Sequence, residues 1–148
     1  MKIVGSGNNV LKFFNNIKNK KITCRIYSID AYEENLLDGY IKACGDCAWS
    51  VYSAMIDYSE FMSAIQNLTV EIYGSEPGVG FQEHYIIENG EFIIDEEASY
   101  MELCEDDEFE LEELAKDLKC QVNQLKKQMD EQGCIKIDGL DNFGEFEI

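Results

Sequence analysis

At 148 residues and 45% apolar composition, the chain is expected to form one compact domain, or one domain with a small appendage. Its formal net charge of −18 disfavours direct binding to nucleic acid, because affinity for phosphate backbones comes from cations. No apolar run approaches the roughly 20 residues needed to cross a bilayer. The first residues do not resemble a signal peptide, so we expect a cytoplasmic protein with reduced cysteines.

The chain begins with a pattern of strand, helix and strand. Met1–Gly5 is predicted to be a short strand, and Asn8 or Asn9 is predicted to cap a helix over Val10–Ile17. The apolar stripe of this helix consists of Val10, Leu11, Phe13, Phe14 and Ile17. Lys21–Ile29 alternates between apolar and polar residues, which indicates a half-buried strand with Ile22, Cys24 and Ile26 on one face.

A second strand–helix–strand unit follows. Asp38-Gly39 predicts a turn into a strand over about Tyr40–Val51. The next elements are a helix over about Asp57–Asn67, with Phe61, Met62 and Ile65 inward, and a strand over Leu68–Tyr73. This order is the ferredoxin-like βαββαβ pattern, an antiparallel sheet with two helices on one face, and it says nothing about iron–sulfur chemistry.

A hairpin is predicted to extend this sheet. Phe81–Ile87 and Glu91–Ile94 flank Asn89-Gly90, the dipeptide that favours two-residue hairpin turns. The fold class is therefore α+β, with residues 1–98 forming a ferredoxin-like domain that carries an added β-hairpin.

Residues 99–148 are predicted to form a second, acidic module. Helices are expected over Phe109–Leu118 and Val122–Glu131, with Gly133 ending the second, followed by strands over Cys134–Ile137 and Phe143–Ile148. The apolar spacing resembles a winged helix-turn-helix at Leu111, Leu114, Ala115, Leu118, Cys120, Leu125 and Met129.

Three interpretations of this C-terminal module are open: DNA binding, protein contact, and a plain helical pair without a function of its own. In a DNA-binding protein, Lys126 and Lys127 would contact DNA, but Asp130, Glu131 and the nearby acids contradict the basic footprint of such a helix. Lys119 also stands where the turn usually has glycine. We favour a helix-turn-helix-like module used for protein contact over operator binding, and a plain helical pair packed on the sheet remains open.

Charge is distributed unevenly along the chain. Residues 1–29 carry six basic groups and no acid, whereas residues 95–117 carry twelve acids against one lysine. Such a surface attracts basic partners, although the acids could serve only solubility. We call the carboxylates from Asp95 to Glu113 the acidic strip: Asp95, Glu96, Glu97, Glu102, Glu105, Asp106, Asp107, Glu108, Glu110, Glu112 and Glu113.

The Cys44-Gly45-Asp46-Cys47 run invites a redox or zinc interpretation. Exchange motifs usually begin a helix, whereas this run falls within a predicted strand. Structural zinc needs four ligands, and the remaining cysteines are scattered singly. We favour packing of these thiols, and we expect no bound metal and no cofactor.

Two further runs combine unusual residues at turns. Trp49, beside Asp46, would either line a recognition surface or seal the sheet against a helix. Glu76-Pro77-Gly78 forms a rigid kink that is not a phosphate loop, since no lysine follows. Glu76, Glu83 and His84 could pair as general acid and base, but we favour a structural, hydrogen-bonded role for His84.

These runs resemble a known family. Gly45–Ser50, followed after a helix by Val70-Glu71-Ile72-Tyr73 and Glu76-Pro77-Gly78, is similar to the YubB-type ferredoxin-like proteins of phages, plasmids and other mobile elements. The resemblance covers about residues 20–95 and implies a ferredoxin-like fold and a mobile-element origin. It implies no settled activity, and it does not extend to the acidic C-terminal part.

The sequence thus predicts a non-enzymatic interaction protein without catalytic residues. It would bind and inhibit a basic host protein, such as a nuclease or another nucleic-acid-handling defence factor, in the manner of an anti-CRISPR protein, with carboxylates mimicking phosphates. The acidic strip would form the binding surface, with Trp49, Glu76 and Glu83 as anchors. The alternatives are a transcriptional regulator using the C-terminal helices, and a small-ligand binder or enzyme using Trp49, Glu76, Glu83 and His84.

Overall fold

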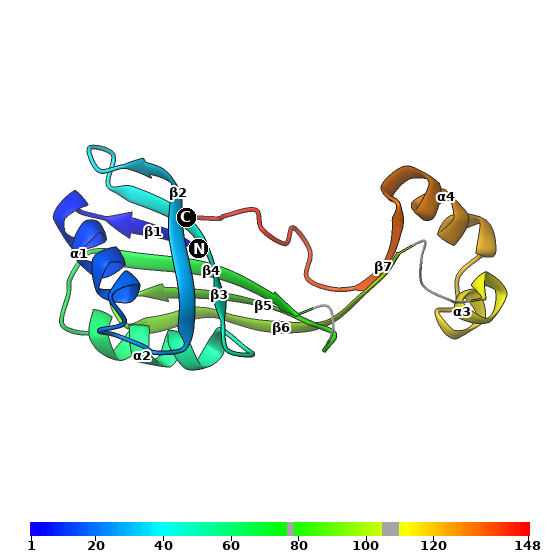
Figure 1. The fold of residues 1–148 in the computed structure, drawn as a ribbon, viewed down its shortest axis with the longest axis horizontal. Coiled ribbons are helices and arrows are strands. Elements are labelled where there is room, and N and C mark those ends of the chain that lie inside the picture. Colours follow the sequence, from blue (N-terminus) through cyan, green and yellow to red (C-terminus); the bar gives the residue numbers. More distant parts are fainter. Residues whose placement is uncertain (77–78, 105–109) are drawn as a thin grey trace.

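The computed structural model describes residues 1–76, 79–104 and 110–148. In these ranges the protein is an α+β structure with one antiparallel sheet of order β2-β3-β1-β4-β5-β6-β7 (Figure 1). The elements are β1 (Lys2–Gly5), α1 (Gly7–Lys18), β2 (Ile26–Asn35), β3 (Tyr40–Cys47), α2 (Tyr52–Met62), β4 (Leu68–Glu76), β5 (Phe81–Glu88), β6 (Glu91–Cys104), α3 (Leu111–Asp117), α4 (Val122–Gln132) and β7 (Cys134–Asp138).

The first strand and helix form where the sequence predicts them, with a different cap. Ser6 is the N-cap residue of α1, and its Oγ accepts a hydrogen bond from the Asn9 backbone N–H at 3.4 Å, so the prediction of Asn8 or Asn9 was wrong. The buried residues of α1 are Val10, Phe13, Phe14 and Ile17. Leu11, predicted to belong to this stripe, is exposed.

The second strand lies further along the chain than predicted. β2 begins at Ile26 rather than Lys21 and continues to Asn35. Ile26 and Ile29 are buried, whereas Cys24 is exposed. Shifts in the register between β2 and β3 interrupt the regular alternation of side chains. For this reason Ile26 and Ile29 both point inward although three positions separate them.

Helix α2 also begins earlier than the local sequence indicates. It starts at Tyr52, directly after the region predicted to be strand and before the predicted start near Asp57, and it ends at Met62 rather than near Asn67. Strand β3 correspondingly ends at Cys47. Met62 is buried as predicted, and Phe61 and Ile65 pack partly buried against the core.

The following strands agree with the predicted hairpin. Leu68, Val70 and Ile72 of β4 are buried, and Asn89-Gly90 connects β5 to β6. β6 is longer than expected and runs through the domain boundary predicted between residues 98 and 99. Only its last five residues pair with β7.

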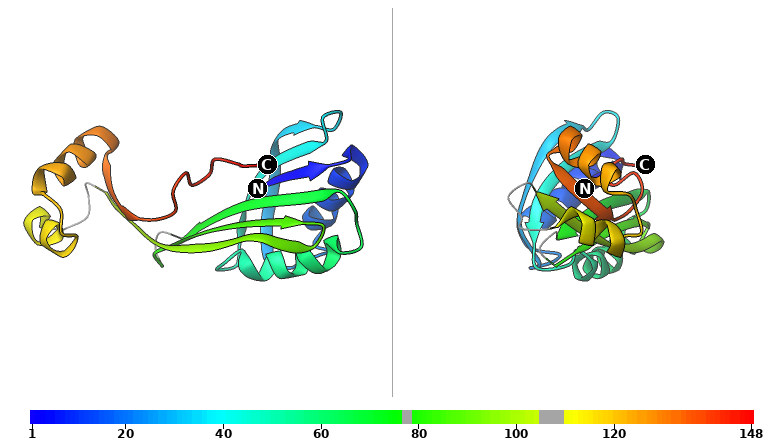
Figure 2. Two further views of the ribbon diagram at one scale, coloured as in Figure 1. Left: turned by 180° about the vertical axis from the view of Figure 1, so that it is seen from behind. Right: turned by 90° about the vertical axis from the view of Figure 1, so that its right-hand side faces the viewer.

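The C-terminal part contains two short helices and one strand in its described residues. Gly133 ends α4 in the left-handed conformation, as predicted. Residues Phe143–Ile148, predicted to be a strand, have no strand conformation, and β7 pairs with β6 instead. The chain after β7 runs back along the sheet and ends beside the N-terminus (Figure 2).

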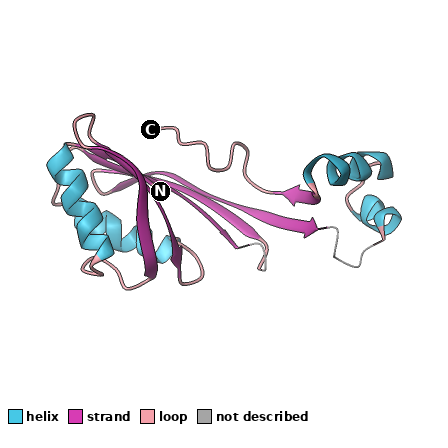
Figure 3. Ribbon diagram, turned by 45° about the horizontal axis from the view of Figure 1, so that its top comes forward, coloured by secondary structure: helices cyan, strands magenta, loops and turns pink. Residues whose placement is uncertain are grey.

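Two hydrophobic clusters stabilise the described residues. In the larger one, α1 and α2 pack side by side on one face of the sheet (Figure 3), with the Phe13 and Tyr58 rings 5.3 Å apart. The smaller cluster, at the far end of β6, consists of Ala115, Leu125 and Ile135 with partly buried neighbours. None of the helices in the described ranges is long and apolar enough to cross a membrane.

Candidate functional site

The described part of the acidic strip follows β6 into α3. Asp95, Glu96 and Glu97 are consecutive, exposed residues of β6 at a point where the strand pairs only with β5. Glu102 is partly exposed where β6 pairs with β7, and Glu110, Glu112 and Glu113 are exposed at the start of α3. Glu105, Asp106, Asp107 and Glu108 lie outside the described residues.

Few of these carboxylates are neutralised within the molecule. Among the described residues, none of them lies within 4.0 Å of a lysine or arginine nitrogen. The one ion pair that they make under this limit joins Glu96 to His84 Nδ1 at 3.8 Å. The described carboxylates of the strip therefore present negative charge to the solvent without an ion-paired lysine or arginine.

Glu83, predicted as a surface anchor, is only 1% exposed and holds α2 in place. Its Oε1 accepts the Val51 backbone N–H at 2.7 Å, and its Oε2 accepts the Ser50 hydroxyl at 2.6 Å. The Tyr85 hydroxyl donates to the same Oε2 at 3.0 Å. A carboxylate at a helix N-terminus satisfies N–H groups that have no partner within the helix, so Glu83 supports the fold rather than a direct partner contact.

His84 faces the opposite side of the sheet. It is buried, its Nε2 lies 2.9 Å from Glu71 Oε1, and its ring stacks in parallel on Tyr73 at 4.1 Å. This arrangement agrees with the structural reading of His84. Glu71 carries no sequence signal for such a role: it is fully buried although it occupies an outward position in the alternation of β4.

A C-terminal segment, residues 139–148, explains the burial of Glu71. Glu71 accepts the backbone N–H groups of Glu147 and Ile148 at 2.8 to 3.0 Å. The Tyr73 hydroxyl donates to the carbonyl oxygen of Glu145 at 2.8 Å. Phe143 and Phe146 pack edge-on against Tyr73. This segment covers Glu71 and Tyr73 on the face of the sheet opposite α1 and α2.

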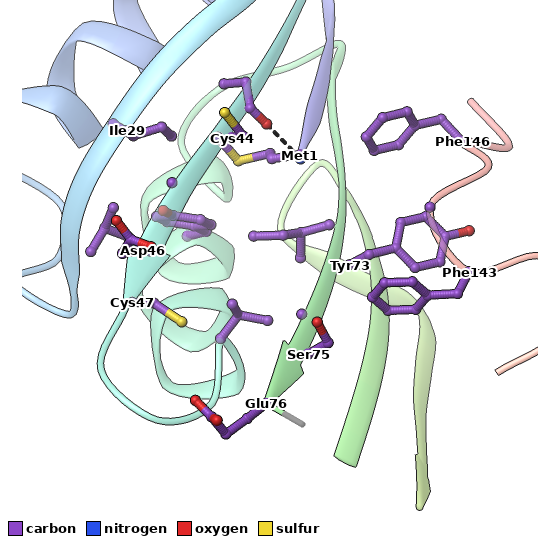
Figure 4. Close-up of a pocket in the computed structure, with 18 of the residues that line it drawn as sticks. Met1, Ile29, Cys44, Asp46, Cys47, Tyr73, Ser75, Glu76, Phe143 and Phe146 are labelled. Carbon is purple, nitrogen blue, oxygen red and sulfur yellow. Dashed lines mark hydrogen bonds between the residues drawn. The ribbon is translucent and has the colours of Figure 1, made fainter. Parts of the chain in front are cut away.

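A cavity of about 450 Å³, here called the sheet cavity, opens between β3 and β4. β1 separates these strands only as far as Lys2, so Ala43–Cys47 and Ile72–Glu76 continue with no strand between them. Figure 4 shows Cys44, Asp46 and Cys47 along one wall and Tyr73, Ser75 and Glu76 along the other, with Phe143 and Phe146 beside Tyr73. Val51 and Tyr58 contribute the α2 side.

The sheet cavity contains two of the four residues predicted for a ligand site. Trp49 and Glu76 line it, whereas Glu83 and His84 do not. Trp49 is 78% exposed and has a φ of +62°, which is unusual for a bulky side chain and marks a locally strained backbone. Pro77 and Gly78, which follow Glu76, lie outside the described residues.

The cysteine pair borders the sheet cavity. Cys44 is exposed, Cys47 is partly buried, and both are free thiols. Burial raises the pKa of the Cys47 thiol, and the charges of Glu83, Asp46 and Glu76 raise it further. A raised thiol pKa is the opposite of what an attacking redox cysteine requires. The described residues contain no group of three or more side chains that could hold a metal ion.

Lys126 and Lys127 are exposed on α4. Lys127 Nζ lies 3.8 Å from Glu131 on the next turn. The apolar residues assigned to the helix-turn-helix spacing gather in the smaller hydrophobic cluster with Leu103 and Ile137. Comparisons of the chain with protein-family models, with curated proteins and with solved structures give no match.

Proposed function

We propose that this protein binds a basic partner protein through the acidic strip and thereby blocks it. The observation that carries the proposal is the exposed run Asp95-Glu96-Glu97 on β6, whose carboxylates have no lysine or arginine within ion-pair distance in the described residues. Such a surface favours association with a cationic surface, mainly by accelerating encounter and selecting the partner.

The partner class follows from the same charge. Proteins that handle nucleic acids carry cationic surfaces that neutralise phosphates, and clustered carboxylates offer these surfaces a similar charge. A host nuclease or another defence factor is therefore the partner that we propose. The resemblance to proteins of phages and other mobile elements fits such a role.

We also propose that residues 1–76 form a ferredoxin-like βαββαβ unit. The support is the strand order β2-β3-β1-β4, with antiparallel neighbours, α1 between β1 and β2, and α2 between β3 and β4. In this reading β5, β6 and the C-terminal helices are additions to the unit. The described residues of the acidic strip lie on these additions.

Charged side chains on an edge strand also prevent sheets from pairing edge to edge, so the experiment must separate binding from solubility. The test compares a strip variant (Asp95→Asn, Glu96→Gln, Glu97→Gln) with a control variant (Glu34→Gln, Glu60→Gln, Glu88→Gln). Both lose three exposed carboxylates, so their net charges are equal.

Each immobilised variant is exposed to host lysate, and retained proteins are identified. The native protein and the control are expected to retain the same basic protein at about 0.1 M salt and to release it at about 1 M, where the screening length falls from about 10 to about 3 Å. The strip variant is expected not to retain this protein at either salt concentration. Equal retention by the two variants, or retention insensitive to salt, would contradict the proposal.

DNA binding by α4 is the weaker alternative. Lys126 and Lys127 are accessible, but Lys127 is paired with Glu131, and Asp130 and Glu131 follow the two lysines on the same helix. A gel shift with DNA from upstream of the gene, abolished by Lys126→Glu with Lys127→Glu, would favour regulation over protein binding.

A further inference from the structure

The sheet cavity contains a polar group that the protein itself does not satisfy. Tyr58 is fully buried, and its hydroxyl has no hydrogen-bond partner among the described residues. Buried hydroxyls in folded proteins are nearly always paired, so an unpaired one at a cavity wall indicates a position where another molecule supplies the partner. Tyr58 lines the sheet cavity, next to Cys47.

The charged groups that line the cavity indicate the sign of the charge that such a molecule would carry. Asp46 and Glu76 line it, and its described lining residues include no lysine, arginine or histidine. The one amino group at the wall, that of Met1, donates to the Ala43 carbonyl oxygen at 2.8 Å. Negative charge beside an apolar, partly enclosed space favours a cation over a neutral or anionic molecule of the same shape.

The aromatic side chains that line the cavity favour a ligand with an apolar part. Tyr32, Trp49, Tyr73, Phe143 and Phe146 all line the cavity. Aromatic faces attract organic cations as well as apolar groups. Trp49 lines the cavity and is largely exposed, so it lies at the mouth rather than in the core.

From these three observations we infer that the sheet cavity binds a small organic ammonium compound with an apolar body. The ammonium group lies near the carboxylate of Asp46, the apolar body lies among the aromatic walls, and the Tyr58 hydroxyl forms a hydrogen bond with a polar group of the ligand. The volume of about 450 Å³ falls within the range of small-molecule sites. A single lysine side chain of a protein partner would leave much of it unfilled. This site is separate from the acidic strip.

Trp49 is the only tryptophan, so its fluorescence reports on the cavity directly. The probe is 2-phenylethylammonium, compared with neutral 2-phenylethanol and anionic 3-phenylpropionate, which share its phenyl body. We expect a saturable change with the ammonium compound and at least about tenfold weaker binding of the other two. Non-saturable changes, or equal affinity for the three compounds, would overturn the inference.

Two conservative variants test the placement. Tyr58→Phe removes only the hydroxyl, and Asp46→Asn removes only a charge. Loss of one hydrogen bond or one nearby charge is expected to weaken binding of the ammonium compound by about fivefold in each. Unchanged affinity in both variants, with unchanged far-ultraviolet circular dichroism, would refute the assigned contacts.

A control separates this inference from the proposed function. The strip variant (Asp95→Asn, Glu96→Gln, Glu97→Gln) lies outside the cavity lining and is expected to bind 2-phenylethylammonium with native affinity. A loss of binding in this variant equal to that in Asp46→Asn would show that net charge, rather than the cavity, attracts the probe, and would overturn the inference while leaving the strip proposal standing.

Discussion

Replacing Glu83 by glutamine is the sharpest test of how the site region is built. The native carboxylate accepts three hydrogen bonds at 2.6 to 3.0 Å, from the Val51 N–H and from the hydroxyls of Ser50 and Tyr85. Glutamine keeps one oxygen, so the Val51 N–H stays paired. The other oxygen becomes an amide nitrogen, so the Ser50 hydroxyl loses its charged acceptor and the Tyr85 hydroxyl keeps only the longer contact to Glu97 Oε1 at 3.2 Å.

Hydrogen bonds to a charged group contribute about 1.5–3 kcal/mol each, against about 1 kcal/mol for neutral ones. Weakening two of them predicts that Glu83→Gln lowers the free energy of unfolding by about 2–3 kcal/mol. For a domain of this size, that corresponds to a fall in Tm of about 5–10 °C. Glu83→Ala removes both acceptor oxygens, and with them all three hydrogen bonds, and should cost about 4–5 kcal/mol.

The assay is urea unfolding followed by circular dichroism, with thermal unfolding as a second measurement. Glu88→Gln is the matched control, because Glu88 is an exposed carboxylate on the same strand and its substitution should change stability by less than about 0.5 kcal/mol. Amide exchange at Val51 should accelerate in Glu83→Ala, which removes its acceptor, and should stay unchanged in Glu88→Gln. If the two glutamine variants unfold at the same urea concentration, Glu83 does not anchor α2.

Three further predictions concern other parts of the chain. Glu71→Gln should accelerate amide exchange at the last two residues, whose N–H groups it accepts, while exchange in α1 stays unchanged; equal acceleration in α1 would count against a local role. Gly39→Ala should lower the free energy of unfolding in urea far more than Gly133→Ala. Both glycines have positive φ, but a Cβ at Gly39 would overlap backbone atoms, whereas a Cβ at Gly133 would meet nothing within 4 Å. The cost of Gly133→Ala should therefore be about 1 kcal/mol. Alkylation of Cys47, followed by mass spectrometry, should be slow near neutral pH because its raised pKa lowers the thiolate fraction; Asp46→Asn should speed it, and an unchanged rate would argue against the charge effect.

Elements with local signals could be predicted from the sequence. The Asn89-Gly90 turn, the end of α4 at Gly133 and the alternation of β4 depend on neighbouring residues, and each is present in the structure. The start of α2 could not be predicted, because Val51 has no side-chain cap and the acceptor comes from Glu83 on a distant strand. The shift of β2 comes from irregular pairing, which alternation cannot reveal.

Only part of the candidate site could be predicted from the sequence, because side-chain direction and strand length decide which residues meet. Glu83 and His84 are neighbours on one strand, so their side chains point to opposite faces and could not have shared a pocket. Trp49 and Glu76 meet at the sheet cavity because β1 is shorter than β3 and β4. That difference in strand length, like the cover that residues 139–148 provide over Glu71, emerges only when the strands are paired.

The division of the apolar residues into two clusters has a consequence for how the molecule unfolds. Among the residues that the structure describes, only Ala115, Leu125 and Ile135 are buried in the smaller cluster, too few to sustain a free-standing fold. Their order depends on β6, whose first part is anchored in the larger sheet. Helices α3 and α4 should therefore unfold as one cooperative unit that depends on the larger sheet. They should open and close while the larger sheet, α1 and α2 stay folded, and they should not remain folded once β5 and β6 separate.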